Sequence, residues 1–120
     1  MKLKVFKCNK CGTVLLSFDD SEVLECCGNE MVEQVPNSVD ASFEKHLPTY
    51  TIMDNKIIAE VHHVMEDEHY IEWILALTED GHEIVHLEPG MEAKVEFNKA
   101  NVKEIYAYCN KHGLWRTIVE

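Results

Sequence analysis

Two close pairs of cysteines near the N-terminus have the residue types and spacing of a metal site. Cys8 and Cys11 are separated by two residues, and Cys26 and Cys27 are adjacent. Four thiolates from two short pairs can complete a tetrahedral site for zinc or iron. Buried free cysteines would have no reason to occur in two close pairs, so the pattern favours a metal centre. The adjacent pair departs from the repeated C-x2-C of zinc ribbons, and the spacing leaves structural zinc and redox-active iron both open.

A second group of possible ligands combines one cysteine with histidines from separate segments. Cys109 and His112 lie three positions apart near the C-terminus and resemble half of a metal site. The histidines that can complete the site are His46, His62, His63 and His69. Imidazole suits a borderline transition ion, and a lone thiolate donates electron density strongly along one axis.

Each of these histidines also has a simpler interpretation as an exposed or hydrogen-bonded residue. His82 and His86 fit that interpretation, because they share one face of an expected hairpin arm. His62 and His63 are neighbours, so on a strand their side chains point to opposite faces and only one of them can bind the ion. Composition alone does not choose between the two.

A different chemistry for the C-terminal pair is a thiol nucleophile with its base. Cys109 and His112 could touch across a tight turn, which such a pair requires. The sequence offers no evident third group to orient the histidine, and this hypothesis leaves the other histidines unexplained. We therefore favour metal binding.

Composition and charge limit the possible partners. The chain has 120 residues, of which 46% are apolar and 28% charged, as in a globular protein. No apolar run reaches the roughly 18 residues that span a bilayer, and the N-terminus lacks an apolar signal region. We therefore expect a cytoplasmic protein without a membrane partner. A formal net charge of −11 argues against nucleic acid as a partner. In a reducing compartment, an odd count of five cysteines favours metal ligation over disulfides.

The elements that must position these ligands are mostly strands. Residues 1–36 hold four of the cysteines and few large apolar residues, so we expect a small metal-stapled domain there. Residues 37–120 contain short apolar runs separated by turn signals such as Asp54-Asn55 and Asp80-Gly81. This spacing predicts a second domain built as an antiparallel sandwich or small barrel, and a helix over 40–46 remains possible.

Five motifs in order resemble the desulfoferrodoxin family, the two-iron superoxide reductases. The motifs are CNKCG at 8–12, CCGNEM at 26–31, EKHLP at 44–48, HHVMEDEHYIEW at 62–73 and YCNKHGLW at 108–115. They cover nearly the whole chain, and together they are far more specific than any one alone. The resemblance implies a mainly β fold, with a small desulforedoxin-like domain followed by an immunoglobulin-like antiparallel β-sandwich.

The resemblance also implies which residues bind iron. The four-cysteine centre matches Cys8, Cys11, Cys26 and Cys27, and the catalytic centre matches His46, His63, His69, His112 and Cys109. The family spaces two of its histidines six positions apart, as His63 and His69 are, which makes His62 a bystander. Lys45 matches the lysine that attracts the substrate, and Glu44 matches the glutamate that binds oxidised iron. Val64 departs from the family's usual proline and is expected to leave the backbone there less rigid.

The activity implied by the resemblance is one-electron reduction of superoxide to hydrogen peroxide without release of oxygen. Two irons per chain, reduced rubredoxin as electron donor and a homodimer are implied in the same way. One alternative is a rubredoxin-like electron-transfer protein that uses only the four-cysteine iron. Another is a zinc-stapled binding module that acts through its acidic surface.

Overall fold

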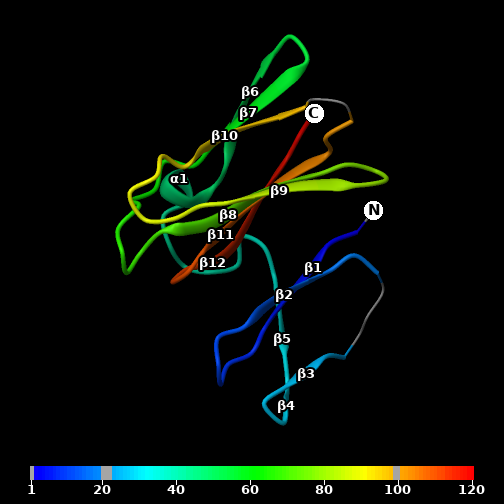
Figure 1. Cartoon of the computed structure of the whole chain (residues 1–120), viewed down its shortest axis with the longest axis vertical. Coiled ribbons are helices and arrows are strands. Elements are labelled where there is room, and N and C mark those ends of the chain that lie inside the picture. Colours follow the sequence, from blue (N-terminus) through cyan, green and yellow to red (C-terminus); the bar gives the residue numbers. More distant parts are fainter. Residues whose placement is uncertain (1, 20–22, 99–100) are drawn as a thin grey trace. The chain divides into compact units, whose positions relative to one another are not determined.

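The computed structural model describes residues 2–19, 23–98 and 101–120, and it divides the chain into two compact units. The first unit is Met1–Val35 and the second is Pro36–Glu120 (Figure 1). That residues 1–36 and 37–120 act as separate domains stays our prediction. Within the described residues, no helix is long and apolar enough to cross a membrane.

The first unit is a small antiparallel β structure. Strand β1 (Lys4–Lys7) is central and pairs with β2 (Val14–Ser17) on one side and β5 (Val32–Gln34) on the other. Strands β3 (Glu25–Cys26) and β4 (Asn29–Glu30) form a separate short hairpin. Among the described residues of this unit, Phe6, Cys8 and Met31 form a buried apolar cluster with Leu24 and Cys26 packed against it, and Val5 is also buried. So small a core contributes little to the free energy of unfolding, and domains of this size commonly need a bound metal to be stable.

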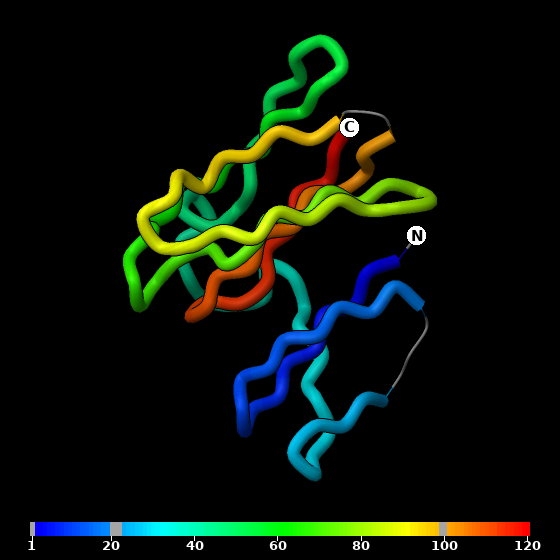
Figure 2. Tube along the Cα trace, viewed as in Figure 1, coloured from blue at the N-terminus to red at the C-terminus, as the bar shows by residue number. Residues whose placement is uncertain are grey.

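The second unit is a sandwich of two antiparallel sheets. One sheet has the order β10-β7-β6 and the other β12-β11-β8-β9. The strands are β6 (Thr49–Met53), β7 (Lys56–Glu60), β8 (Ile71–Leu77), β9 (His82–His86), β10 (Lys94–Asn98), β11 (Glu104–Cys109) and β12 (Gly113–Ile118). The β6–β7 hairpin is the green loop at the top of Figure 2, and β7 pairs along its whole length with β10. The predicted mainly β fold is confirmed.

The predicted turn signals lie where the strands reverse. Asp54 and Asn55 join β6 to β7, and Asp54 has the positive φ of 55° that aspartate tolerates in a turn. Gly81 lies in the turn between β8 and β9, where its carbonyl oxygen accepts a bond from the Thr78 N–H at 2.9 Å. Local turn chemistry therefore sets both hairpins.

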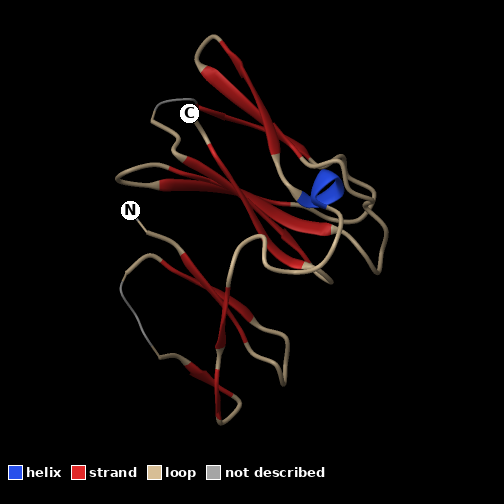
Figure 3. Ribbon diagram, turned by 180° about the vertical axis from the view of Figure 1, so that it is seen from behind, coloured by secondary structure: helices blue, strands red, loops and turns tan. Residues whose placement is uncertain are grey.

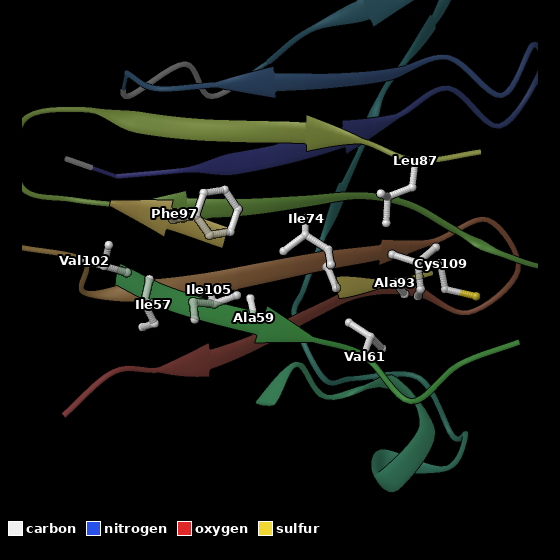
Figure 4. Packing of buried hydrophobic residues seen from close by; sticks show 13 residues of the cluster. Ile57, Ala59, Val61, Ile74, Leu87, Ala93, Phe97, Val102, Ile105 and Cys109 are labelled. Carbon is white, nitrogen blue, oxygen red and sulfur yellow. The ribbon is translucent and has the colours of Figure 1, made fainter. Parts of the chain in front are cut away.

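The core between the two sheets is built by alternation along the strands. In β11, Ile105, Ala107 and Cys109 point into this core, so the sulfur of the last residue belongs to the core face. The cluster, drawn in Figure 4 with Cys109 at one end, comprises Ile57, Ala59, Val61, Ile71, Ile74, Ala76, Leu87, Ala93, Phe97, Val102, Ile105, Ala107 and Cys109.

Three connecting segments of the second unit carry the remaining histidines. The first contains the short helix α1 (Phe43–His46), blue in Figure 3, which falls within the stretch where a helix remained possible. The second, residues 61–70, joins β7 to β8, and the third, residues 110–112, joins β11 to β12. His82 and His86, at the two ends of β9, are both exposed, in keeping with their interpretation as ordinary surface histidines rather than ligands.

Candidate metal centres

His46 is oriented by a bond to the residue that precedes its helix. Its side chain is 4% exposed, and Nδ1 lies 2.7 Å from the carbonyl oxygen of Ser42. A carbonyl only accepts, so Nδ1 carries the proton and the lone pair is left on Nε2. Burial lowers the pKa of His46, which keeps the ring neutral at physiological pH.

His63 and His69 face each other across the segment that joins β7 to β8. Nδ1 of His63 donates to the carbonyl oxygen of Val64, which again leaves the lone pair on Nε2. Nε2 of His63 lies 3.1 Å from Nε2 of His69. Reciprocal backbone bonds between Glu66 and His69, at 3.0 and 3.1 Å, hold the loop closed. Burial, together with the neighbouring imidazoles, lowers the pKa of both histidines.

Cys109 ends strand β11, and His112 lies in the turn that follows. The cysteine is fully buried, and its pairing with β8 shifts register between Tyr108 and Cys109. The N–H of His112 points at the Cys109 sulfur, 3.4 Å away. Burial raises the pKa of the Cys109 thiol, while the backbone N–H groups of Lys111 and His112 oppose that effect. A thiolate here therefore requires a further positive charge, which a metal ion supplies.

These segments bring five donor atoms together, all within 4.8 Å of one another. The group is His46, His63, His69, Cys109 and His112. Nε2 of His46 lies 3.0 Å from Nδ1 of His112, and the Cys109 sulfur lies 3.4 Å from Nε2 of His63. Imidazole nitrogens gathered around one sulfur are a donor set that fits a transition ion such as iron. His62 is exposed and lies outside the group.

The four N-terminal cysteines form the second group, also with donor atoms within 4.8 Å of one another. All are free thiols, and the Cys26 sulfur lies 3.6 Å from that of Cys11 and 3.8 Å from that of Cys27. A hydrogen bond with the Thr13 hydroxyl lowers the pKa of Cys11 to about 6, whereas the neighbouring Cys11 sulfur leads the causes that raise the pKa of Cys26 to about 12. Sulfurs so crowded cannot all ionise without a cation, which is the chemistry of a tetrathiolate iron or zinc site.

The two predicted substrate-side residues are exposed on helix α1. Lys45 lines an open pocket of about 430 Å³ together with His63, Val64 and Met65. Glu44 precedes it in the helix and is also exposed. Of the group, His63 borders this pocket; His63, His69 and His112 are half-buried, whereas His46 and Cys109 are buried.

Asn110 is a positioning residue that the sequence analysis did not single out. Its side-chain oxygen accepts from the Tyr70 N–H at 3.0 Å, and its side-chain amide donates to the Glu68 carbonyl at 3.0 Å. Its own N–H donates to the Tyr70 carbonyl at 3.2 Å. These three hydrogen bonds link the turn next to Cys109 to the segment that carries His69. The only sequence signal was its place in the motif YCNKHGLW.

Comparison with known proteins agrees with this geometry. The family model for desulfoferrodoxin matches residues 38–118. A desulfoferrodoxin from Clostridium acetobutylicum is 36% identical over 118 residues, which are 95% of this chain and 94% of that protein. A desulfoferrodoxin homolog from Archaeoglobus fulgidus is 35% identical over an alignment that covers 96% of each chain.

A solved structure is similar over nearly the full length. The crystal structure of the superoxide reductase from Treponema pallidum superposes with a TM-score of 0.79 at 25% identity. The superposition covers 98% of this chain and 99% of the other. With its four-cysteine group and its group of four histidines and one cysteine, which match two iron centres, this chain belongs to the desulfoferrodoxin family.

Proposed function

We propose that this protein is a superoxide reductase. The observation that carries the proposal is the convergence of four imidazoles, three of them partly exposed, and one buried thiol. When bound, iron(II) supplies the one electron that, with two protons, converts superoxide to hydrogen peroxide. The similarity to the Treponema pallidum enzyme, which is a superoxide reductase, supports the same assignment.

The roles of the ligand residues follow from their surroundings. Four neutral imidazoles and one thiolate would hold the ion with one position left for a small anion. Burial under the core keeps Cys109 away from solvent, so the substrate would approach past the half-buried imidazoles of His63, His69 and His112. The Cys109 thiolate would donate electron density to the bound ion, which would favour release of the product as hydrogen peroxide over cleavage of its O–O bond.

The side chains beside the site would handle an anionic substrate. With a formal net charge of −11, the protein repels an anion at long range. The ammonium of Lys45 lines the pocket beside His63, where it would partly offset the negative charges of Glu60 and Glu92, which line the pocket too. Glu44, on the same helix, would occupy the open position once the iron is oxidised.

The test is a superoxide assay on protein loaded with two irons per chain, with peroxide and oxygen both measured. A reductase supplied with electrons yields one peroxide for each superoxide and evolves no oxygen. Oxygen evolution at one molecule for every two superoxide radicals would instead mark a dismutase. Rapid electron transfer without any superoxide consumption would favour the rubredoxin-like alternative. Reduced rubredoxin as the donor, a homodimer and a cytoplasmic location are further parts of this proposal.

A further inference from the structure

Trp115 contacts two of the iron-ligand candidates although it has no donor atom for a metal. It lies in β12 and is fully buried. Its ring stacks on the imidazole of His46, with centroids 4.8 Å apart and planes inclined by 24°. Its indole N–H donates to the carbonyl oxygen of His112 at 3.1 Å. One side chain therefore connects two histidines that lie 66 positions apart in the sequence.

Helix α1, which carries His46, needs such a support. The helix has only four residues, and the side chain of its N-cap residue, Ser42, makes no capping bond. A helix of one turn is unstable by itself in water, so tertiary contacts must hold it. The first residue of the helix, Phe43, packs edge-on against Trp115 at a centroid distance of 5.2 Å and an angle of 84°. Trp115 thus touches both ends of the helix.

We propose that Trp115 is a positioning residue for the four-histidine, one-cysteine centre. Its ring packs against α1 and fixes the plane of the His46 imidazole. Its N–H, through the bond to the His112 carbonyl, fixes the backbone that carries the His112 ring. The inference rests on this group binding the iron, as proposed above. Groups that orient metal ligands typically contribute 10- to 100-fold to metal affinity, and this sets the size of the expected effect.

Two substitutions at Trp115 separate the stacking from the hydrogen bond. Trp115→Phe keeps an aromatic face for His46 and loses the donor to His112, whereas Trp115→Leu loses both. The matched control is Trp73→Phe, because Trp73 is also buried in the same sheet, 4% exposed, but stacks on Tyr108 at 5.6 Å. Phe43→Leu is the mildest test, since Phe43 is 49% exposed and its replacement leaves the core intact.

The experiment is titration of the metal-free full-length chain with Co²⁺, followed by absorption spectroscopy. The two centres give different spectra, since one binds Co²⁺ through four sulfurs and the other through a single sulfur with imidazoles. For Trp115→Leu we expect the Co²⁺ affinity of the four-histidine, one-cysteine centre to fall at least about tenfold. The Co²⁺ affinity of the four-cysteine centre should be unchanged. Trp115→Phe should recover part of this loss, and Phe43→Leu should show a smaller loss in the same direction. Trp73→Phe should bind as the unsubstituted protein does.

The outcomes distinguish positioning from general stability. A merely structural role would weaken Trp73→Phe as much as Trp115→Phe, or would affect both centres together, and either result would overturn the inference. Should Trp115→Leu fail to fold, equal Co²⁺ affinity in Trp115→Phe, Phe43→Leu and the unsubstituted protein would overturn it equally. The predicted pattern in a protein that does not reduce superoxide would support the positioning role and refute the proposed function.

Discussion

Two hydrogen bonds to the backbone decide which ring nitrogens of His46 and His63 face the centre of four histidines and one cysteine. His46 donates from Nδ1 to the Ser42 carbonyl, and His63 donates from Nδ1 to the Val64 carbonyl. Both rings therefore present Nε2 lone pairs, and the acceptor at residue 64 is a backbone atom. A carbonyl is present in valine and proline alike, so the departure at Val64 from the family's usual proline keeps this bond. The tautomer of His63 does not depend on that side chain.

Lys45 supplies a prediction at the same scale. We expect Lys45→Ala to slow superoxide capture about tenfold without loss of iron, because it removes the positive charge beside the pocket that His63 lines. Pulse radiolysis at two ionic strengths measures this rate. Lys45→Arg keeps the charge and should keep most of the rate.

The remote control for this prediction is Lys56→Ala. Lys56 is 59% exposed on β7 and pairs with Glu96 at 3.3 Å, so its loss changes net charge equally without altering the pocket. Equal slowing in Lys45→Ala and Lys56→Ala would show that only the total charge matters. The local role of Lys45 would then be wrong.

Among the structural elements, the connection between the β11–β12 turn and the β7–β8 segment holds the site together. Asn110 makes side-chain bonds of 3.0 Å to the backbone of Tyr70 and of Glu68, so the two segments cannot separate without losing both. Ligands on different segments depend on such links, because each segment alone has several conformations.

We expect Asn110→Ala to lower the free energy of unfolding by about 2 kcal/mol, at about 1 kcal/mol for each lost hydrogen bond. It should also speed iron loss from the imidazole centre. Chemical denaturation and the rate of iron transfer to a chelator measure the two effects. Thr78→Val is the control, because it removes a side-chain bond to the backbone, from the Thr78 hydroxyl to the Gly81 carbonyl at 2.9 Å, in a turn that carries no ligand. Faster iron loss in both variants would mean that global stability controls metal release.

The buried Tyr106 in strand β11 leads to a prediction about the free energy of unfolding at alkaline pH. Burial raises the pKa of Tyr106 above its ordinary value of 10.0, with Arg116 opposing the shift and Glu104 adding to it. The folded state therefore holds this proton more tightly than the unfolded state does. Its contribution is fully present below pH 10 and is lost as pH rises through the folded pKa. We expect the free energy of unfolding to fall above pH 10, and less steeply in Tyr106→Phe, as urea titrations at fixed free metal would show. An identical slope in both proteins would contradict this.

At the scale of the whole molecule, the two units differ in what stabilises them. The unit Pro36–Glu120 has a core cluster drawn from both sheets, whereas Met1–Val35 has a core of Phe6, Cys8 and Met31. Hydrophobic burial can stabilise Pro36–Glu120 without a metal. We expect Met1–Val35 to need, in addition, the bonds between its cysteines and a metal.

We therefore predict that Cys8→Ser lowers the iron content from two to one per chain. Amide hydrogens of residues 2–19 and 23–35 should lose protection from exchange, while those of β8 and β11 keep theirs. Metal analysis combined with hydrogen exchange checks both parts. Retained protection in the N-terminal residues after metal removal would show that the small core suffices.

Much of the fold and the site could be predicted from local sequence. The turn at Asp80-Gly81 set a hairpin, and alternation in β11 placed Cys109 on one face together with Ile105 and Ala107. Pairs such as Cys109 and His112 are close in space because they are close in the chain. Residues three positions apart in a turn have few other arrangements.

The sequence by itself determined the donor types and the separation of four sulfurs from a second set of imidazoles with one sulfur. Only the tertiary structure decided that Nε2 of His46 meets Nδ1 of His112, that Trp115 lies against both residues, and that Asn110 links two segments. Sequence spacing constrains atoms within one turn of chain. Distances between remote segments depend instead on strand register and side-chain packing, which arise from the whole fold at once.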